Sequence, residues 1–164
     1  MTCKYGKLFK NTSTNKVSCF VYNCNQNYYA FIQNMLQKGY HQCIVTSDIM
    51  IKILEQYILC GNIQVTSIEF MIEDEELNEE TKYLLKLMEN NSAYWQKLKE
   101  KLSFLSQNDS IEMKKVNFRS LEDRGSMFSI QVNGIIMVSD CEFDRVSKKI
   151  SSIVEDCIKW KYPQ

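Results

Sequence analysis

Few side chains in this sequence of 164 residues have the type and spacing needed for nucleophilic, acid–base or metal chemistry. His41 is the single histidine, and no serine or cysteine lies in a nucleophile motif that would accompany it. Four residues separate Cys19 from Cys24, and His41 lies two before Cys43, but neither pair joins a second pair at zinc-site spacing. We therefore interpret these cysteines as buried structural residues. The sequence predicts a protein that is not an enzyme and that holds no metal or cofactor.

The cysteine content and the apolar runs indicate a reducing compartment. No N-terminal stretch has the basic start, apolar middle and small-residue cleavage site of a signal peptide. The longest apolar runs are far shorter than the ~20 residues that cross a bilayer, so we expect no membrane partner. The seven cysteines are expected to be free thiols: Cys3, Cys19, Cys24, Cys43, Cys60, Cys141 and Cys157.

The charge balance argues against strong binding of polyanions by this chain alone. Its 20 basic and 20 acidic side chains cancel, whereas such binding depends on many Lys and Arg residues that neutralise phosphates. If the chain acts on nucleic acid, a partner therefore supplies much of the affinity. The one charge-biased segment is Glu73–Glu80, with six acids in eight residues. We interpret it as a solvated acidic loop, because adjacent carboxylates alone do not define a coordination shell.

The apolar periodicity predicts one domain, residues 1–164, of strands with a helical insertion at about 74–110 and a terminal helix. Gly61 is expected to end a helix, because glycine is favoured just after a helix C-terminus. The apolar phase changes between Val65 and Ile68, which indicates a β-bulge. The predicted strands are Lys16–Asn25, His41–Ser47, Ile63–Ile72, Ile111–Leu121 and Met127–Val138, and the predicted helices are Asp48–Cys60, two within Leu77–Gln107 that break near Asn90-Asn91-Ser92, and a last one at about 140–162.

One segment decides between two folds. Asn27–Met35 has apolar residues on one helical face, yet its aromatic content favours a strand, and we predict that it pairs with Val17–Asn25. As a helix, it would complete a β-α-β-α-β unit over residues 17–72, in which ligands gather at the carboxyl ends of the strands. Asp48 and Asp74 would lie near that edge, and the chain would then be a metal-dependent hydrolase or nuclease.

The region around Gly134 also has two interpretations. Asn133-Gly134 fits a two-residue hairpin turn. However, one alternation of apolar residues runs from Phe128 to Val138 straight through it, which is equally consistent with a long strand bent at Gly134. Small barrels need such bends.

With Asn27–Met35 as a strand, the element order is that of an OB-fold, a five-stranded Greek-key barrel that binds single-stranded nucleic acid or protein partners. The segments that match are Gln37–Thr46, the step from Gly61 into Ile63-Gln64-Val65, and Asp123-Arg124-Gly125-Ser126 before the last strand and helix. In these segments the sequence resembles the smallest subunit of the CST telomere complex, the counterpart of the smallest subunit of replication protein A. The resemblance covers roughly two thirds of the chain, and OB-folds share pattern more than sequence. The helical insertion and the segment before Lys16 depart from the family pattern.

The resemblance implies a non-enzymatic nuclear subunit at the telomeric region of chromosomes. Members of this family pair with a larger OB-fold subunit, largely through the C-terminal helix, and the assembly protects telomeric single-stranded DNA and supports complementary-strand synthesis. In some lineages the complex associates with telomerase. The apolar spacing of the last helix also indicates a docking seam, although packing on its own barrel is the alternative interpretation. The predicted partner-binding residues are Val146, Ile150, Ile153, Val154, Cys157 and Trp160.

Aromatic and basic residues give a candidate nucleic-acid surface. Tyr22 and Tyr29 lie on the predicted first hairpin, where bases would stack, although core packing is the alternative for at least half of the aromatic residues there. Lys114 and Lys115, with Arg119 nearby, are candidates for phosphate contact, and a charged exposed strand edge is the alternative. A small inhibitor or adaptor protein of another system also fits the absence of catalytic motifs.

Overall fold

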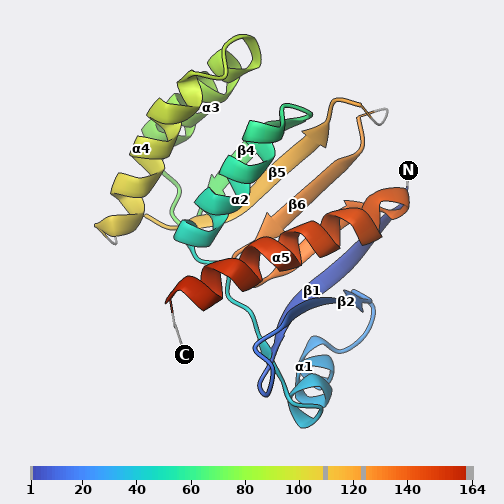
Figure 1. Ribbon diagram of the computed structural model, residues 1–164. Coiled ribbons are helices and arrows are strands. Elements are labelled where there is room, and N and C mark those ends of the chain that lie inside the picture. The colour runs from blue at the N-terminus through green and yellow to red at the C-terminus, as the bar shows by residue number, and fades with distance from the viewer. Residues whose placement is uncertain (1, 109–110, 123–124, 162–164) are drawn as a thin grey trace. The chain divides into compact units, whose positions relative to one another are not determined.

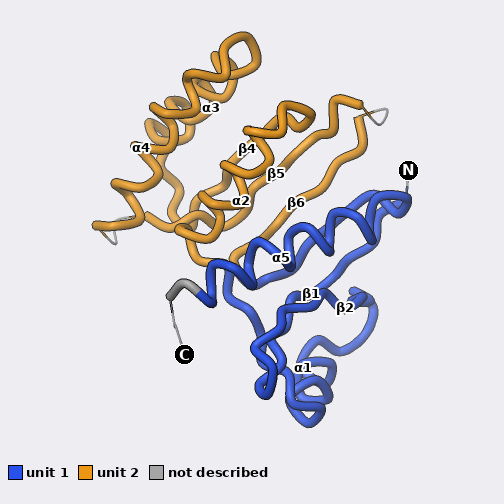
Figure 2. The backbone as a smooth tube through the Cα atoms, viewed as in Figure 1, with its two compact units in different colours: residues 1–45, 133–164 blue, residues 46–132 orange. Residues whose placement is uncertain are grey.

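The computed structural model describes residues 2–108, 111–122 and 125–161. The fold is mixed α/β, with 48% helix and 29% strand, and its seven described strands form antiparallel sheet. The chain divides into two compact units (Figure 2). Unit 1 consists of residues 1–45 and 133–164, and unit 2 consists of residues 46–132. Helix exceeds strand, so the chain is mixed α/β rather than mainly β as the sequence predicted.

Unit 1 is built around β1 (Cys3–Asn11), a strand that the sequence analysis missed. β2 (Val17–Tyr22) pairs along one side of β1. The other side is shared end to end by β7 (Ile135–Ser139), opposite the first part of β1, and by β3 (Tyr40–Gln42), opposite its last part. β1 therefore has three antiparallel partners and is the central strand of the unit.

Helices cover both faces of β1. On one face, Phe9 is buried with Ile32 and Met35 of α1 (Tyr28–Gln37), and the rings of Phe20 and Phe31 pack edge-on against it. On the other face lies α5 (Phe143–Lys161), which contacts β1, β2 and β7 and follows a short 3-10 turn, η1 (Asp140–Glu142) (Figure 1). This double coverage explains why β1 shows no simple alternation of apolar and polar residues.

Unit 2 contains three strands with helices along them. β4 (Ile63–Phe70), β5 (Met113–Ser120) and β6 (Met127–Gln131) pair in that order. The helix α2 (Ser47–Cys60) packs on β4 and β5, while α3 (Glu75–Asn90) contacts β4, and α4 (Tyr94–Gln107) contacts α2 and α3 (Figure 1).

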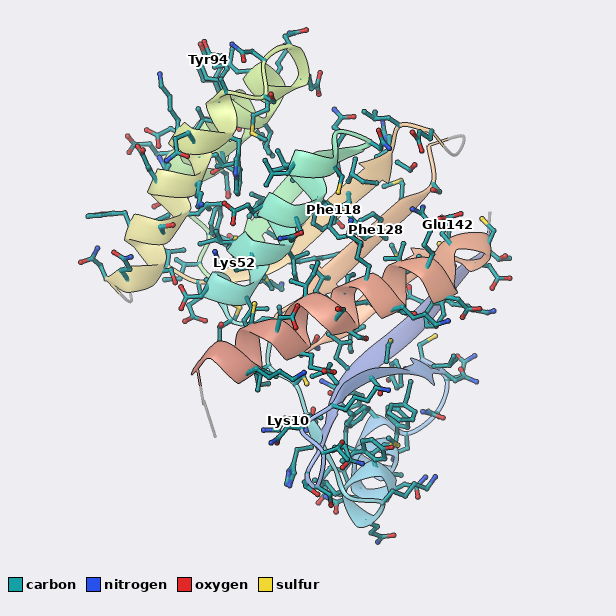
Figure 3. The ribbon with its side chains drawn as sticks, viewed as in Figure 1. Lys10, Lys52, Tyr94, Phe118, Phe128 and Glu142 are labelled. Atoms are coloured by element: carbon teal, nitrogen blue, oxygen red, sulfur yellow. The ribbon has the colours of Figure 1, made fainter. Side chains whose placement is uncertain are left out.

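The core beneath α2 is aromatic. The rings of Phe118 and Phe128 (labelled in Figure 3) stack with centroids 4.6 Å apart. The ring of Tyr57 lies 5.4 Å from that of Phe118 and 5.0 Å from that of Phe128. Such ring pairs contribute about 0.5–1.5 kcal/mol each beyond the burial of their area. They fix which face of β5 and β6 points toward α2.

The chain passes between the units at two places, after Val45 and before Asn133. In unit 1 both places lie next to Leu8. The Leu8 amide donates to the carbonyl of Gly134 at 2.9 Å, and the Leu8 carbonyl accepts from the amide of Cys43 at 3.1 Å. We call this arrangement of Leu8, Cys43 and Gly134 the junction. The break at Gly134, which has φ 76°, separates β6 from β7, and the two strands pair with β5 and β1, respectively.

The predicted strand at Asn27–Met35 is wrong, because this segment forms α1. The Asn27 side chain accepts a hydrogen bond from the Ala30 amide at 3.0 Å and so caps the helix. The apolar side chains that one helical face brings together then reach the Phe9 cluster. Packing of an amphipathic face therefore outweighed the strand preference of the aromatic residues.

A closed OB-fold barrel is not shown. In unit 1, β2 and β7 lie on opposite sides of β1, and α1 takes the place that the barrel required for a strand. The alternative β-α-β-α-β unit has its helix, but it has no doubly wound parallel sheet, because β2 and β3 both pair antiparallel with β1.

Several local predictions are confirmed. α2 ends at Cys60, with Gly61 left-handed at φ 76°, and the β4 register shifts between Val65 and Ser67 as the phase change indicated. The insertion forms two helices that separate at Asn91, and the last helix follows β7. The predicted turn at Asp123-Arg124 lies outside the described residues.

Replacing Gly134 with alanine is expected to lower the free energy of unfolding by about 2–4 kcal/mol. The substitution would place a Cβ atom 2.5 Å from the Cys43 carbonyl oxygen at a residue with φ 76°. Gly61 is the matched control, because it has the same φ and no atom within 4 Å of the added Cβ. Gly61→Ala should therefore lose only about 1 kcal/mol in the same denaturant titration. Equal losses in the two variants would contradict the close contact at the junction.

Candidate functional site

The predicted docking seam on α5 is mostly buried within the protein. Val146, Ile150 and Val154 are at most 3% exposed, on a helix whose contacts in unit 1 are with β1, β2 and β7. Ile153 and Cys157 are half-buried. The side chain of Trp160 lies outside the described residues. Intramolecular packing therefore accounts for three of the six predicted residues, and partner binding stays a prediction for Ile153 and Cys157.

Substitution with glutamate should separate these two roles. Ile150 is fully buried, so Ile150→Glu is expected to destabilise the protein by several kcal/mol. Ile153→Glu places a charge at a half-buried position and is expected to lose less than about 2 kcal/mol. Thermal unfolding of both variants measures the difference. If Ile153→Glu loses as much stability as Ile150→Glu, Ile153 belongs to the core and is excluded as a docking residue.

The predicted stacking residues do not form one platform. Tyr22 on β2 is half-buried, with its ring 5.6 Å from that of Tyr28 and 5.5 Å from that of Phe31. The ring of Tyr22 therefore belongs to the cluster between β2 and α1. Tyr29 lies on α1 and is 72% exposed. Only Tyr29 of this pair presents an open ring to a base.

The predicted phosphate-contacting residues lie together on β5. Its Phe118 ring points toward α2, so alternation places Lys115, Asn117 and Arg119 on the opposite face. Lys114 lies at the register shift between Lys115 and Met113, and alternation does not place it on that face. Arg119 is exposed, as is Lys114 at the start of the strand, and Lys115 is half-exposed. No ion pair joins these three cations to an acid among the described residues. We call Lys114, Lys115 and Arg119 the β5 basic row.

The neighbours of the β5 basic row are polar. Across the strands, Glu69 of β4 lies opposite Lys115, and Ser67 lies opposite Asn117. The Asn117 amide donates to the Ser67 hydroxyl at 2.8 Å and to the Glu69 carboxylate at 3.4 Å. The Glu69 carboxylate keeps its negative charge and offsets one of the three positive charges of the row, which still leaves a local excess of positive charge. This face of the strands offers cations and hydrogen-bonding groups but no aromatic platform.

Lys7 is an unusual buried group that the sequence analysis missed. Its side chain is 0% exposed, and its ammonium donates to the backbone carbonyl of Asn133, beside the junction. Burial lowers the pKa of Lys7 from 10.5 to about 8. Burial likewise raises the pKa of the nearby Cys43 thiol to about 11, although the positive charge of Lys7 opposes that rise. Because Cys3–Asn11 was not recognised as a strand, no signal in the sequence marked Lys7 as internal.

Asp48 and Asp74, which the hydrolase alternative would have placed at a metal site, have other roles in the structure. Asp48 accepts from the Ser106 hydroxyl at 2.8 Å. Asp74 caps α3 by accepting from the Leu77 amide at 2.9 Å, which places most of the acidic segment in a helix rather than a loop. Within residues 2–108, 111–122 and 125–161, no cluster of three or more His, Cys, Asp or Glu is placed to hold a metal ion.

None of the seven cysteines forms a disulfide in the described structure, as predicted. Their predicted burial holds for Cys43 but not for Cys24, which is exposed, and Cys19 is half-buried. His41 is exposed on β3. No described helix has the length and apolar character needed to cross a membrane.

No protein-family model, curated protein or solved structure matches this chain.

Replacing Lys7 with methionine is expected to raise the free energy of unfolding at pH 7 by about 1–2 kcal/mol. The change removes a buried charge, and the loss of the hydrogen bond to the Asn133 carbonyl offsets part of the gain. Lys86→Met is the control, because Lys86 is exposed on α3 and the substitution should change stability by less than about 0.5 kcal/mol.

The same pair of proteins tests the pKa of Lys7. The folded pKa of about 8 lies below the ordinary 10.5, so the unfolded chain binds more protons between these two pH values. Wild-type stability should therefore rise relative to Lys7→Met as pH increases from about 8 to 10.5, by up to about 3 kcal/mol. Denaturant titrations across this range measure the difference. If the difference in unfolding free energy between the two proteins stays constant over this pH range, the pKa of Lys7 is not lowered in the folded protein.

Proposed function

We propose that this chain is a non-enzymatic binding subunit that contacts single-stranded nucleic acid weakly through the β5 basic row. The observation that supports the proposal is the position of Lys114, Lys115 and Arg119 on one strand, without ion pairs among the described residues. By contrast, most of the ion pairs that the structure describes link an exposed lysine or arginine to an acid on its own helix or on an adjacent element. The unpaired row is therefore a local excess of positive charge on a neutral protein.

Such a row gives modest affinity. Three cations release about three counterions at most, and single-stranded nucleic acid then binds with a slope of about −2 in log K against log salt. Without base stacking by aromatic side chains, little sequence preference is expected. The net charge of zero adds no long-range attraction. A partner subunit would then supply the affinity and the sequence specificity.

The more specific form of the proposal is a subunit of a CST-like telomere complex in the nucleus, paired with a larger OB-fold subunit. Its support is the sequence resemblance, together with the terminal helix after the last strand. The helical insertion between β4 and β5 departs from the family pattern and adds no support. The barrel on which the resemblance also relied is not shown. The telomeric role, including any association with telomerase, therefore rests on the sequence resemblance more than on the geometry.

The basic row can be tested by the salt dependence of binding. A fluorescent dT20 oligonucleotide is titrated with the full-length protein between 25 and 200 mM salt. Wild type should bind with a slope of about −2, and K114Q/K115Q/R119Q should lose most of that slope. The control K38Q/K86Q/K148Q removes the same charge from three exposed lysines on other parts of the chain and should keep the wild-type slope.

Two further results bear on the proposal. We expect the isolated chain to bind a G-rich telomeric repeat no more tightly than dT20, because the row contacts phosphates rather than bases. If both triple variants lose the slope equally, binding follows net charge rather than the row, and the proposed surface is wrong. Cleavage of either oligonucleotide on addition of Mg²⁺ or Mn²⁺ would overturn the non-enzymatic assignment.

A further inference from the structure

The outer edge of β4 carries main-chain groups that have no partner strand among the described residues. Two hydrogen bonds fix which residues point outward. The Leu121 amide donates to the Asn62 carbonyl at 2.9 Å, toward β4, and the Ser120 amide donates to the Ser126 carbonyl at 2.8 Å, away from β4. Ile63, which lies opposite Ser120, therefore directs its own N–H and C=O away from β5.

The same alternation continues along the strand. The Lys114 carbonyl accepts from Val132 at 2.9 Å, so β5 turns the backbone groups of residues 114, 116, 118 and 120 away from β4. Val65 lies opposite Phe118, and Ile68 lies opposite Val116 beyond the bulge, so both point their backbone groups outward. No described hydrogen bond satisfies these groups.

The outward groups of Val65 and Ile68 are not in open water, whereas Ile63 is half-exposed. Val65 is 5% and Ile68 is 7% exposed. Buried backbone donors and acceptors are almost always paired with protein or with ordered water. The edge of β4 therefore has unmet hydrogen-bonding capacity at Val65 and Ile68, on the two sides of the bulge.

α3 covers this edge incompletely. Two cavities of about 490 Å³ and 420 Å³ lie one after the other along the line where α3 meets β4. Leu85 lines both of them, and Thr81, which is 2% exposed with no hydrogen bond to its hydroxyl, lines the second. Exposed apolar side chains stand at both ends of this groove: Leu121 at one end and Met71 and Ile72 at the other.

We propose that the outer edge of β4, in this groove beneath α3, binds an extended peptide segment of a partner protein by strand addition. An added strand can form hydrogen bonds with these groups, because its own backbone N–H and C=O groups complement the unpaired ones on β4. Alternate side chains of the peptide would enter the two cavities, whose walls include Ile63, Val65, Ile68 and Phe70. The occupant is therefore a peptide with apolar residues at alternate positions. Charged side chains, among them Glu69, Lys82 and Lys114 of the β5 basic row, also line the second cavity. The proposal rests on the β4 backbone and does not depend on nucleic-acid binding by the row.

A random twelve-residue peptide library displayed on phage is the probe, selected against the full-length protein. The most enriched sequence is then synthesised, and its backbone amides are N-methylated one at a time. Because only every other amide of an added strand bonds to β4, methylation at alternate positions should weaken binding at least tenfold. Methylation at the intervening positions should change binding less than threefold. This pattern is read from the peptide alone and needs no folded variant.

Two measurements on the protein complete the test. Leu85→Trp fills space shared by both cavities and should weaken binding of the synthetic peptide at least tenfold, whereas the control Tyr83→Trp, exposed on α3, should leave it unchanged. Hydrogen exchange at the Val65 and Ile68 amides should slow at least tenfold in the complex. No enriched peptide, equal sensitivity to N-methylation at all positions, or unchanged exchange at Val65 and Ile68 would each overturn the proposal.

Discussion

The two backbone hydrogen bonds of Leu8 are the constraint on which unit 1 depends. They join one residue of the central strand to both segments through which the chain leaves the unit, at Cys43 and at Gly134. β3 and β7 can share one side of β1 only because these segments meet there. The meeting is so close that a side chain at Gly134 would collide with the Cys43 carbonyl. This contact fixes where β3 and β7 meet along β1.

Lys7 places a desolvated ammonium group beside the junction. An apolar side chain of similar length would fill the same volume without the desolvation of an ammonium group. The buried amine does satisfy the Asn133 carbonyl, and that bond ties β1 to the segment that enters β7. The surfaces proposed for binding lie elsewhere, on β4 and β5 of unit 2, where unpaired cations and unpaired backbone groups remain available.

Local signals in the sequence were sufficient wherever local physics decides structure. Gly61 marked the end of α2, and the change of apolar phase marked the β4 bulge. The asparagine-rich segment near Asn91 marked the separation of α3 from α4. Failures came where tertiary packing decides. Asn27–Met35 became helical because its apolar face reaches Phe9, which lies on a strand that was not recognised. β1 itself, buried on both faces and containing Lys7, has no alternation to recognise. The β5 row was named from sequence, but its lack of ion pairs and the unpaired β4 edge required the three-dimensional pairing.

Chemical-shift mapping by NMR tests the proposed function most directly, because it locates the contact as well as detecting it. Titration of the isotope-labelled full-length protein with dT20 at low salt should move the amide signals of Lys114, Lys115 and Arg119, together with those of the cross-strand neighbours Ser67 and Glu69. Signals of α1 and β2 should stay in place. Shifts confined to Tyr22, Tyr29 and their neighbours, or no shift at millimolar oligonucleotide, would contradict the account.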